Sequence, residues 1–375
     1  MRFAIDATSI PRQMAGAGVY TYNLIRAVAA ADQENEYVVF AKSDAFDDLN
    51  RDEPPFRTVR VSTRSRPARL LWEQVALPVH LRRRKIDALH SPHHTAPMVV
   101  AGCRRVITFH DLTFFLLADR YPRHRLMYFR AVSWATARAA DALICPSQAV
   151  RDDIVRILHV RPEKVYPIAE AAAPEFQPLK DKAALEKLRT RYALPERFIL
   201  SVGSLEPGKN RAALLKAYAG LRKRGLEQKL VVAGQRAWKY EADLALAGEL
   251  GLEGDVLFTG YVPPEEMPAL YNAADLFVFP SLYEGFGLPV IEAMACGVPV
   301  VASNLSAIPE VAGEAALLVD PRDVDQLCDA MERVLRDKRL QAALRRRGLE
   351  RAQGFSWERA ARETIAVYQE TAGKR

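Results

Sequence analysis

Two glutamates flank a glycine-containing loop in the segment of this sequence that is richest in possible chemistry. Residues 275–303 read DLFVFPSLYEGFGLPVIEAMACGVPVVAS, and Glu284 and Glu292 stand eight positions apart within it. Ionised carboxylates only accept hydrogen bonds, so the hydroxyl groups of a sugar or a ribose are natural donors to them. A purely structural interpretation is also open, in which Glu284 caps a helix and Glu292 lies on its solvated face.

The order of residue types in this segment predicts a strand, a loop, a short helix and a second strand. Gly285 and Gly287 fall in the loop, Pro289 suits the first helical turn, and Gly297 suits the position just past the helix end. Free N–H groups at the start of a helix that follows a parallel strand favour a phosphate. Glycines let the backbone approach such an anion closely. The segment therefore predicts a phosphate-binding loop beside two carboxylates.

The elements that must position this loop form a regular series along the whole chain. Short apolar runs alternate with stretches of helical periodicity, and the runs lack strict polar–apolar alternation, which predicts parallel sheets covered on both faces. We expect an α/β protein with two doubly wound halves. The expected strands are residues 2–8, 37–41, 87–91, 105–111 and 141–147, then 198–204, 229–234, 256–261, 275–281 and 298–303.

The length of 375 residues predicts two or three domains. Residues 167–178, which contain several prolines and few strand signals, are the expected boundary. We therefore expect one domain over 1–175, a second over 176–355, and a closing amphipathic helix within 356–375.

Composition excludes several classes of protein. The four cysteines lie far apart with no C-x-x-C pair, which excludes a disulfide scaffold and argues against a zinc ribbon. No apolar run reaches the roughly 18–20 residues that a membrane span needs. The first residues, MRFAIDATSI, lack the apolar core of a signal peptide. We expect a globular cytoplasmic protein.

The net charge of +7 is concentrated in one stretch. Between Arg57 and Lys85 there are nine basic residues and a single acid, Glu73. The stretch is either a solvated loop and helix face or a surface for anionic lipid or a phosphorylated acceptor, as on the inner face of a membrane. Nucleic acid is not an expected partner, because no recognisable reader motif accompanies the charge.

The first half contains two further features that bear on function. His110 ends the expected strand 105–111, and open α/β sheets place ligands at such carboxyl ends, although a lone histidine there is often structural. Gly16 and Gly18 superficially match a dinucleotide fingerprint. The third glycine and the acid that would bind a ribose are missing, which weakens a nicotinamide interpretation.

Three histidines cluster in the segment HSPHHTAP, namely His90, His93 and His94. Metal sites built on histidine usually include a carboxylate or a cysteine, and no such companion completes a site here. We therefore expect no metal site and no metal cofactor.

The segment EGFGLPVIEAMACGVPVV resembles the donor-binding signature of the retaining glycosyltransferases of family 4, which have the GT-B fold. Four other segments match that family in the expected order: GAGVYTYNL, TFHD, SVGSLEPGKN and FTGYVPPEEMPALYNAAD. The final F-S-W-E helix is also similar to the last helix of the family. The resemblance implies two Rossmann-like domains facing across a cleft, with the acceptor bound by 1–175, the nucleotide-sugar donor by 176–355, and the final helix returning to the first domain.

Carried over residue by residue, the resemblance implies a donor site with three catalytic residues. Glu284 and His110 would contact the transferred sugar, and Lys209 would neutralise the leaving phosphate. Glu292 would bind the nucleotide ribose, and the main chain of Val262 would contact the base, although a core valine is an equally ordinary interpretation. Backbone from Gly285, Phe286, Gly287 and Leu288 would hold the diphosphate, and the loop with Gly16 and Gly18 would approach the donor phosphates or the acceptor.

The loop SVGSLEPGKN departs from the family pattern. Ser204 stands where many members have an arginine, and Gly208 stands where a subset has another. Lys209 is then the only cation expected from this loop, with Arg211 as a possible substitute. The form of the loop is most similar to bacterial mannosyltransferases that use GDP-mannose, while UDP- and ADP-sugars remain open. The implied acceptor is a glycan or a lipid-linked glycan; a phosphorylase or a non-enzymatic nucleotide-sugar sensor are the alternatives.

Overall fold

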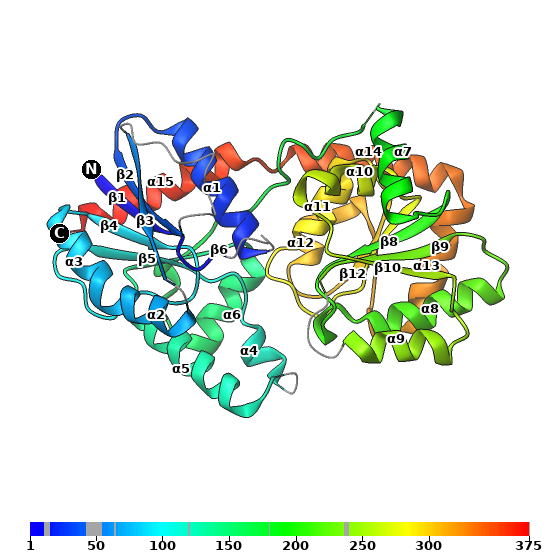
Figure 1. Cartoon of the computed structure of the whole chain (residues 1–375), viewed down its shortest axis with the longest axis horizontal. Coiled ribbons are helices and arrows are strands. Elements are labelled where there is room, and N and C mark those ends of the chain that lie inside the picture. The colour runs from blue at the N-terminus through cyan, green and yellow to red at the C-terminus, as the bar shows by residue number, and fades with distance from the viewer. Residues whose placement is uncertain are drawn as a thin grey trace. The chain divides into compact units, whose positions relative to one another are not determined.

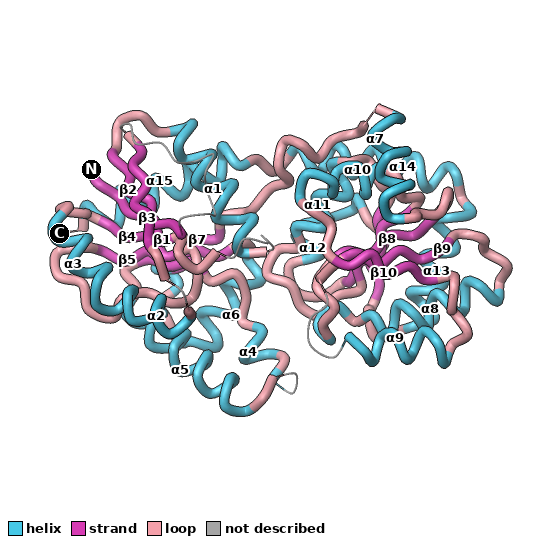
Figure 2. Tube along the Cα trace, in the orientation of Figure 1, coloured by secondary structure: helices cyan, strands magenta, loops and turns pink. Residues whose placement is uncertain are grey.

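The computed structural model describes residues 1–10, 16–42, 55–63, 65–118, 121–179, 181–235 and 240–374. They form two compact units, one made of Met1–Glu170 with Ser356–Arg375 and the other of Ala171–Phe355. Each unit is built on one parallel sheet covered by helices (Figure 1). Strands lie in the interior of each unit and helices lie outside them (Figure 2). The expected α/β class with two doubly wound sheets is confirmed.

The first unit contains a seven-stranded sheet in the order β3-β2-β1-β4-β5-β6-β7, and every strand pair is parallel. The chain proceeds outward from β1 to β3 and then continues in the opposite direction from β4 to β7. The strand order therefore reverses between β1 and β4. The strands are β1 (Arg2–Asp6), β2 (Glu36–Lys42), β3 (Phe56–Val61), β4 (Ala88–Ser91), β5 (Arg104–Thr108), β6 (Ala142–Cys145) and β7 (Val165–Pro167).

Helices lie in the described connections from β1 to β2, from β3 to β4, from β5 to β6 and from β6 to β7, whereas residues 92–103 join β4 to β5 without a helix. The helical segments are α1 (Ala17–Ala31), α2 (Arg66–Leu71), the π-helix η2 (Trp72–Ala76), α3 (Leu77–Arg83), α4 (Thr113–Leu116), α5 (Arg123–Ala139), α6 (Gln148–Leu158) and the 3₁₀ turn η4 (Pro162–Lys164). The segments α2, η2 and α3 follow one another without a break.

The last helix of the chain, α15 (Trp357–Gly373), belongs to the first unit. Its N-terminus is capped by the Ser356 side chain, which accepts a hydrogen bond from the backbone N–H of Arg359. Tyr368 is buried against Phe3, and its hydroxyl lies 2.6 Å from Nδ1 of His90. This contact joins residues 278 positions apart, so the end of the chain completes the core built by its beginning.

The second unit contains a six-stranded parallel sheet in the order β10-β9-β8-β11-β12-β13. Here the order reverses between β8 and β11. The strands are β8 (Phe198–Val202), β9 (Lys229–Ala233), β10 (Val256–Gly260), β11 (Leu276–Phe279), β12 (Val300–Ser303) and β13 (Leu317–Val319).

Helices and 3₁₀ turns again link the strands of the second unit. They are α7 (Lys182–Tyr192), η5 (Pro207–Lys209), α8 (Arg211–Lys223), α9 (Tyr240–Glu249), η6 (Pro264–Glu266), α10 (Met267–Asn272), α11 (Leu288–Ala295), α12 (Ile308–Ala312), η7 (Gly313–Ala315), α13 (Val324–Arg336) and α14 (Lys338–Gln353).

The structure contains three strands that the sequence patterns do not predict. β7 and β13 have three residues each, too few to show a periodic pattern. β3 covers the start of the basic stretch from Arg57 to Lys85, for which we expected either a solvated loop and helix face or a surface for an anionic ligand. It is an edge strand whose middle residues are partly exposed, so basic side chains are tolerated there.

Within the described residues, no helix combines the length and the apolar character that a membrane-spanning helix requires.

Candidate active site

The expected phosphate loop lies where the strand order of the second unit reverses. β8 and β11 are neighbours, and the connections that leave their carboxyl ends run in opposite directions across the sheet. Open α/β sheets bind ligands in the crevice at such a switch point. The loop after β8 contains Ser204 and Lys209, and the loop after β11 contains Glu284. Residues far apart in the sequence are thus brought to one edge of the sheet.

The backbone of the loop after β11 requires glycine at its last position. Gly287 has a φ of 105° and forms the N-cap of α11, and a Cβ atom there would lie 2.5 Å from Cδ1 of Ile308. No side chain caps α11. The first amides of a helix have no partner within the helix, so the N–H of Leu288 begins a helix whose positive end faces this loop, and Gly285 and Phe286 lie in the loop just before the N-cap.

The two loops are joined by a charged pair and by backbone contacts. Nζ of Lys209 lies 2.6 Å from Oε1 of Glu284, and both side chains are largely buried. The hydroxyl of Ser281 also reaches that carboxylate oxygen, and the N–H of Leu282 donates to the carbonyl of Gly208 at 3.0 Å. The ammonium group therefore lies at the loops that the expected diphosphate site would use.

Gly203 makes room for the lysine. A Cβ atom at this position would lie 3.3 Å from Cε of Lys209 and 3.4 Å from its Cδ. Its φ of 140° also disfavours other residues. The first glycine of SVGSLEPGKN is thus required by the path of the lysine side chain.

Arg211 does not replace the missing arginine at Ser204. Only 2% of Arg211 is exposed, and its guanidinium donates to the carbonyls of Ser204, at 2.8 Å, and Gly203. Burial lowers its pKa to about 10, which leaves the group charged at neutral pH. Arg211 therefore stabilises the conformation of the loop through its backbone carbonyls. Our expectation that it could serve as a second ligand-binding cation is wrong.

Glu292 is held by a tyrosine that the sequence patterns did not single out. The hydroxyl of Tyr271 donates to Oε2 of Glu292 at 2.9 Å. Burial and the charge of Glu292 raise the pKa of Tyr271 well above its usual value, so the hydroxyl stays a neutral donor. Glu292 is half-buried in the second turn of α11, which does not fit the solvated helix face considered above. One feature of the sequence indicates that Tyr271 belongs to the site, namely its position in the segment FTGYVPPEEMPALYNAAD, which matches the family.

Three other expected site residues have simple placements. Val262 follows β10 and its side chain is buried, so its main chain is what remains for a ligand. Gly16 is the N-cap of α1 with a φ of 49°. Gly18 lies in the first turn of α1 and is buried, so it belongs to the helix and not to the expected loop. Residues 11–15 of that loop lie outside the described residues.

His110 lies in the first unit, two residues beyond the end of β5 and not in the strand itself. Its Nε2 is 3.1 Å from the carbonyl oxygen of Pro92, and its Nδ1 is 3.6 Å from Oε1 of Glu170. The ring of Tyr20 packs edge-on against the imidazole. Burial by itself would lower the pKa of His110, but the hydrogen bond and the charge of Glu170 raise it above its ordinary value. His110 is thus held towards its charged form.

Glu170→Gln is expected to lower the pKa of His110, because the remaining burial favours the neutral imidazole. A raised pKa contributes stability that is fully present below the unfolded-state pKa, about 6.5, and is lost as pH rises through the folded-state pKa. The variant should therefore lose that pH-dependent part of its stability. An NMR titration of the His110 ring protons gives the pKa directly, and an unchanged value would contradict the assigned cause.

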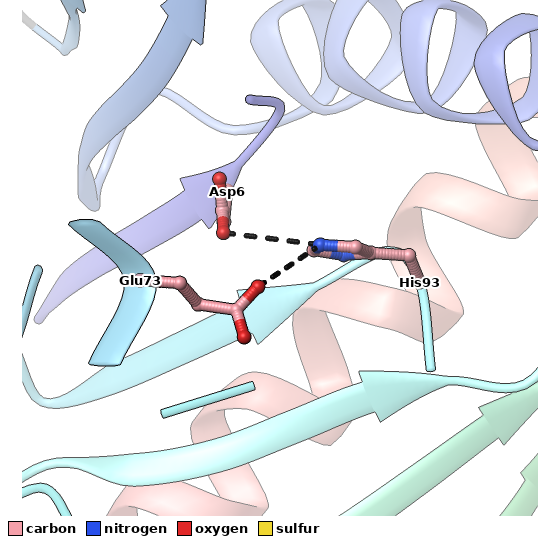
Figure 3. Close-up of side chains that lie close together, drawn as sticks. All are labelled: Asp6, Glu73 and His93. Atoms are coloured by element: carbon pink, nitrogen blue, oxygen red, sulfur yellow. Dashed lines mark ion pairs between the residues drawn. The ribbon is translucent and has the colours of Figure 1, made fainter. Parts of the chain in front are cut away.

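A buried charged cluster lies at the strand-order reversal of the first unit, after β1 and β4. His93 Nε2 is 3.9 Å from Oδ2 of Asp6 and 3.6 Å from Oε2 of Glu73 (Figure 3). Burial raises the pKa of Asp6 to about 6. Our expectation that the histidines have no carboxylate companions is wrong at His93, because two acids come from segments 87 and 20 positions earlier in the chain.

Asp6, Glu73 and His93 together offer three atoms that could hold a metal ion. The guanidinium of Arg69 already contacts two of them, at 2.7 Å from Oε2 of Glu73 and 3.1 Å from Nε2 of His93. Thr95 donates to the same glutamate oxygen at 2.8 Å. A metal ion would have to displace Arg69, so the geometry is that of an internal charge network.

Comparison with solved structures identifies the fold. Sucrose-phosphate synthase from Thermosynechococcus elongatus superposes over 100% of both chains with a TM-score of 0.79 and 23% sequence identity. The two parallel sheets are those of the GT-B architecture. The fold and the donor-type loop thus define the class of GT-B glycosyltransferases.

Sequence comparison then gives the family. The model "Glycosyl transferases group 1" matches residues 186–351, and "Glycosyltransferase Family 4" matches residues 14–171. O-antigen chain mannosyltransferase B of Escherichia coli is 31% identical over 98% of both chains. The serotype-specific mannosyltransferase WbdA of Escherichia coli is 35% identical over 74% of this chain, which spans about a third of that protein. The chain belongs to glycosyltransferase family 4 and is a retaining glycosyltransferase.

Proposed function

We propose that the protein transfers mannose from GDP-mannose to a glycan or lipid-linked glycan, with retention of the anomeric configuration. The observation that supports it most is the match over 98% of both chains to a relative named as an O-antigen chain mannosyltransferase. The loop VGSLEPGKN also resembles that of bacterial mannosyltransferases that use GDP-mannose, which supports the same donor. A nucleotide sugar and a growing surface glycan are then the two partners.

In this proposal the residues at the switch point divide the work of binding and stabilisation. Lys209 and the N-terminus of α11 stabilise the negative charge that develops on the leaving diphosphate, in place of a metal ion. Glu284 accepts hydrogen bonds from hydroxyls of the transferred sugar, and Glu292, oriented by Tyr271, accepts from the ribose. Val262 contacts the base through its main chain and Ser204 lines the diphosphate. The start of α1, with Gly16 as its N-cap and Gly18 in its first turn, approaches the donor phosphates or the acceptor.

Retention follows from attack on the same face as the departing group. The leaving diphosphate takes the acceptor proton, so Glu284 orients the sugar and forms no covalent bond to it. His110, held towards its charged form by Glu170, donates a hydrogen bond to the sugar. The first unit binds the acceptor and the second unit the donor.

A panel of nucleoside diphosphates tests the donor. A ligand at 100 times its Kd adds about 2.7 kcal/mol of stability, so a rise in Tm is readily measured. We expect GDP to stabilise the full chain selectively and GDP-mannose to be consumed in the presence of a mannose-terminated acceptor. Selective stabilisation by UDP or ADP would contradict the assigned donor. Release of mannose phosphate that depends on inorganic phosphate would instead identify a phosphorylase.

Lys209→Ala is expected to weaken GDP binding by roughly 10- to 100-fold, because a charge-assisted contact to a phosphate contributes about 1.5–3 kcal/mol. Isothermal titration calorimetry with GDP measures the change. Lys216→Ala is the matched control, since Lys216 is an exposed lysine of the helix that follows the same loop. Equal affinities for all three proteins would remove Lys209 from the diphosphate site.

A further inference from the structure

Exposed apolar side chains of the described residues are concentrated in one part of the first unit. Ten large hydrophobic side chains are exposed, and eight of them lie between residues 71 and 134. Five of the eight come from two neighbouring segments and form what we call the 71–99 face. They are Leu71 (66% exposed), Val75 (60%), Val79 (46%), Met98 (43%) and Val99 (81%).

The continuous helical segment α2–η2–α3 has two opposite faces. Leu71, Val75 and Val79 are four residues apart and therefore share one face of a helix. Glu73, Leu77 and Leu81 have the same spacing, two positions further along, and all three are buried. Because this second set is packed into the unit, the segment cannot rotate to bury the first set. Leu71, Val75 and Val79, which we call the aliphatic stripe, are therefore exposed as a consequence of the fold.

The inner face of the segment is anchored by charge as well as by packing. Arg69 pairs with Glu73 at 2.7 Å, and Thr95 donates to the same carboxylate. Gln74 then fastens the neighbouring loop: its Oε1 accepts from the N–H of Met98 at 3.0 Å, and its Nε2 donates to the carbonyl of Ala96 at 3.0 Å. These hydrogen bonds tie the backbone next to the exposed Met98 and Val99 to the helical segment that carries Leu71, Val75 and Val79.

The surroundings of the 71–99 face are strongly basic. Between residues 57 and 140 the chain has sixteen Lys and Arg and only four Asp and Glu. Arg66 precedes the stripe, and Arg82, Arg83 and Lys85 follow it, all exposed. Across 65–86, within the described part of the chain, the only acid is the buried Glu73. Along the chain, the aliphatic stripe thus lies between the exposed Arg66 and an exposed basic cluster of Arg82, Arg83 and Lys85.

We propose that the 71–99 face docks on the surface of an anionic phospholipid bilayer. The aliphatic side chains enter the boundary between headgroups and acyl chains, and the four flanking basic residues contact lipid phosphates. A single-stranded nucleic acid would call for aromatic side chains on which bases stack, and the 71–99 face has none. Charge complementarity therefore favours lipid over nucleic acid. The inference deepens the proposed function, because it would hold the enzyme where a lipid-linked acceptor lies.

Co-sedimentation of the full chain with vesicles tests the proposal without either substrate, so its result is independent of the proposed reaction. Two vesicle compositions are compared, phosphatidylcholine alone and phosphatidylcholine with about one third phosphatidylglycerol. We expect binding to the anionic vesicles only, and a steep loss of binding as salt screens the arginines. Binding to both compositions with equal affinity, or to neither, would overturn the proposal.

Two sets of substitutions separate the apolar contribution from the charge. Leu71→Ser with Val75→Ser and Val79→Ser should weaken binding at least about 10-fold at every salt concentration, since less apolar surface is buried. Arg82→Gln with Arg83→Gln and Lys85→Gln should weaken it most at low salt. Leu244→Ser is the matched control, because Leu244 is an exposed apolar residue of the second unit, and it should bind as the wild type does.

The variants also distinguish lipid from other polyanions. All substituted side chains are exposed, so thermal unfolding should show folded proteins. If the serine variant bound vesicles as tightly as the wild type, the aliphatic stripe would have no part in docking and the proposal would fail. The same would follow if the wild type bound a soluble polyanion such as heparin as tightly as anionic vesicles and the serine variant retained both.

Discussion

Glu284→Gln is expected to lower kcat by roughly 10²–10³-fold while changing the Kd for GDP by less than about threefold. The carboxylate contacts Lys209 at 2.6 Å and Ser281, and in the proposed function its charge faces the transferred sugar. The amide keeps the shape of the side chain and can still accept from Lys209, so the phosphate loop should persist. What is lost is the negative charge that orients the sugar in the transition state.

Transfer rates with saturating donor, together with calorimetric titration of GDP, separate the two effects. Glu265→Gln provides the control, because Glu265 is an exposed acid of the same unit in the turn η6. If kcat and GDP affinity fell by the same factor, Glu284 would act by maintaining the nucleotide site, and its assignment as the residue that positions the sugar would be wrong.

Arg69→Ala is expected to destabilise the first unit by about 3–5 kcal/mol, because it leaves a buried carboxylate without its cation. Glu73 is fully buried, and Asp6 lies across His93 from it, so two acids would face each other with only a neutral imidazole between them. Burial and the charge of Arg69 lower the pKa of His93 well below its usual value. Urea unfolding followed by circular dichroism measures the loss.

The double variant Arg69→Ala with Glu73→Gln should recover part of this loss, since the amide needs no counter-ion and can keep the hydrogen bond from Thr95. The urea unfolding of the single and the double variant should be measured with a chelator present, because without Arg69 the side chains of Asp6, Glu73 and His93 could bind an adventitious metal ion. A single variant as stable as the wild type would show that Glu73 does not depend on Arg69. Equal losses in the single and double variants would place the effect in packing of the arginine stem.

The amino-acid sequence by itself determined the fold class and the order of strand, loop and helix after β11. Strand, loop and helix signals act over a few residues, so all ten expected strands occur in the structure, with ends that differ by up to a few residues. The positive φ of Gly287 at the start of α11 is equally local. The short strands β7 and β13 were not predicted, because three residues are too few to show a hydrophobic periodicity.

Tertiary structure alone decided which charged groups meet. Lys209 and Glu284 are 75 positions apart and touch only because β8 and β11 are neighbours at the reversal of strand order. Arg211 is close to the site in sequence, but its buried guanidinium binds backbone carbonyls of the loop. Asp6 lies near His93 only because β1 and β4 are neighbours in the first sheet. Pairing and burial depend on long-range packing, whereas helix and strand signals depend on near neighbours. A sequence motif can therefore indicate candidate groups for chemistry, but only the folded chain determines their partners.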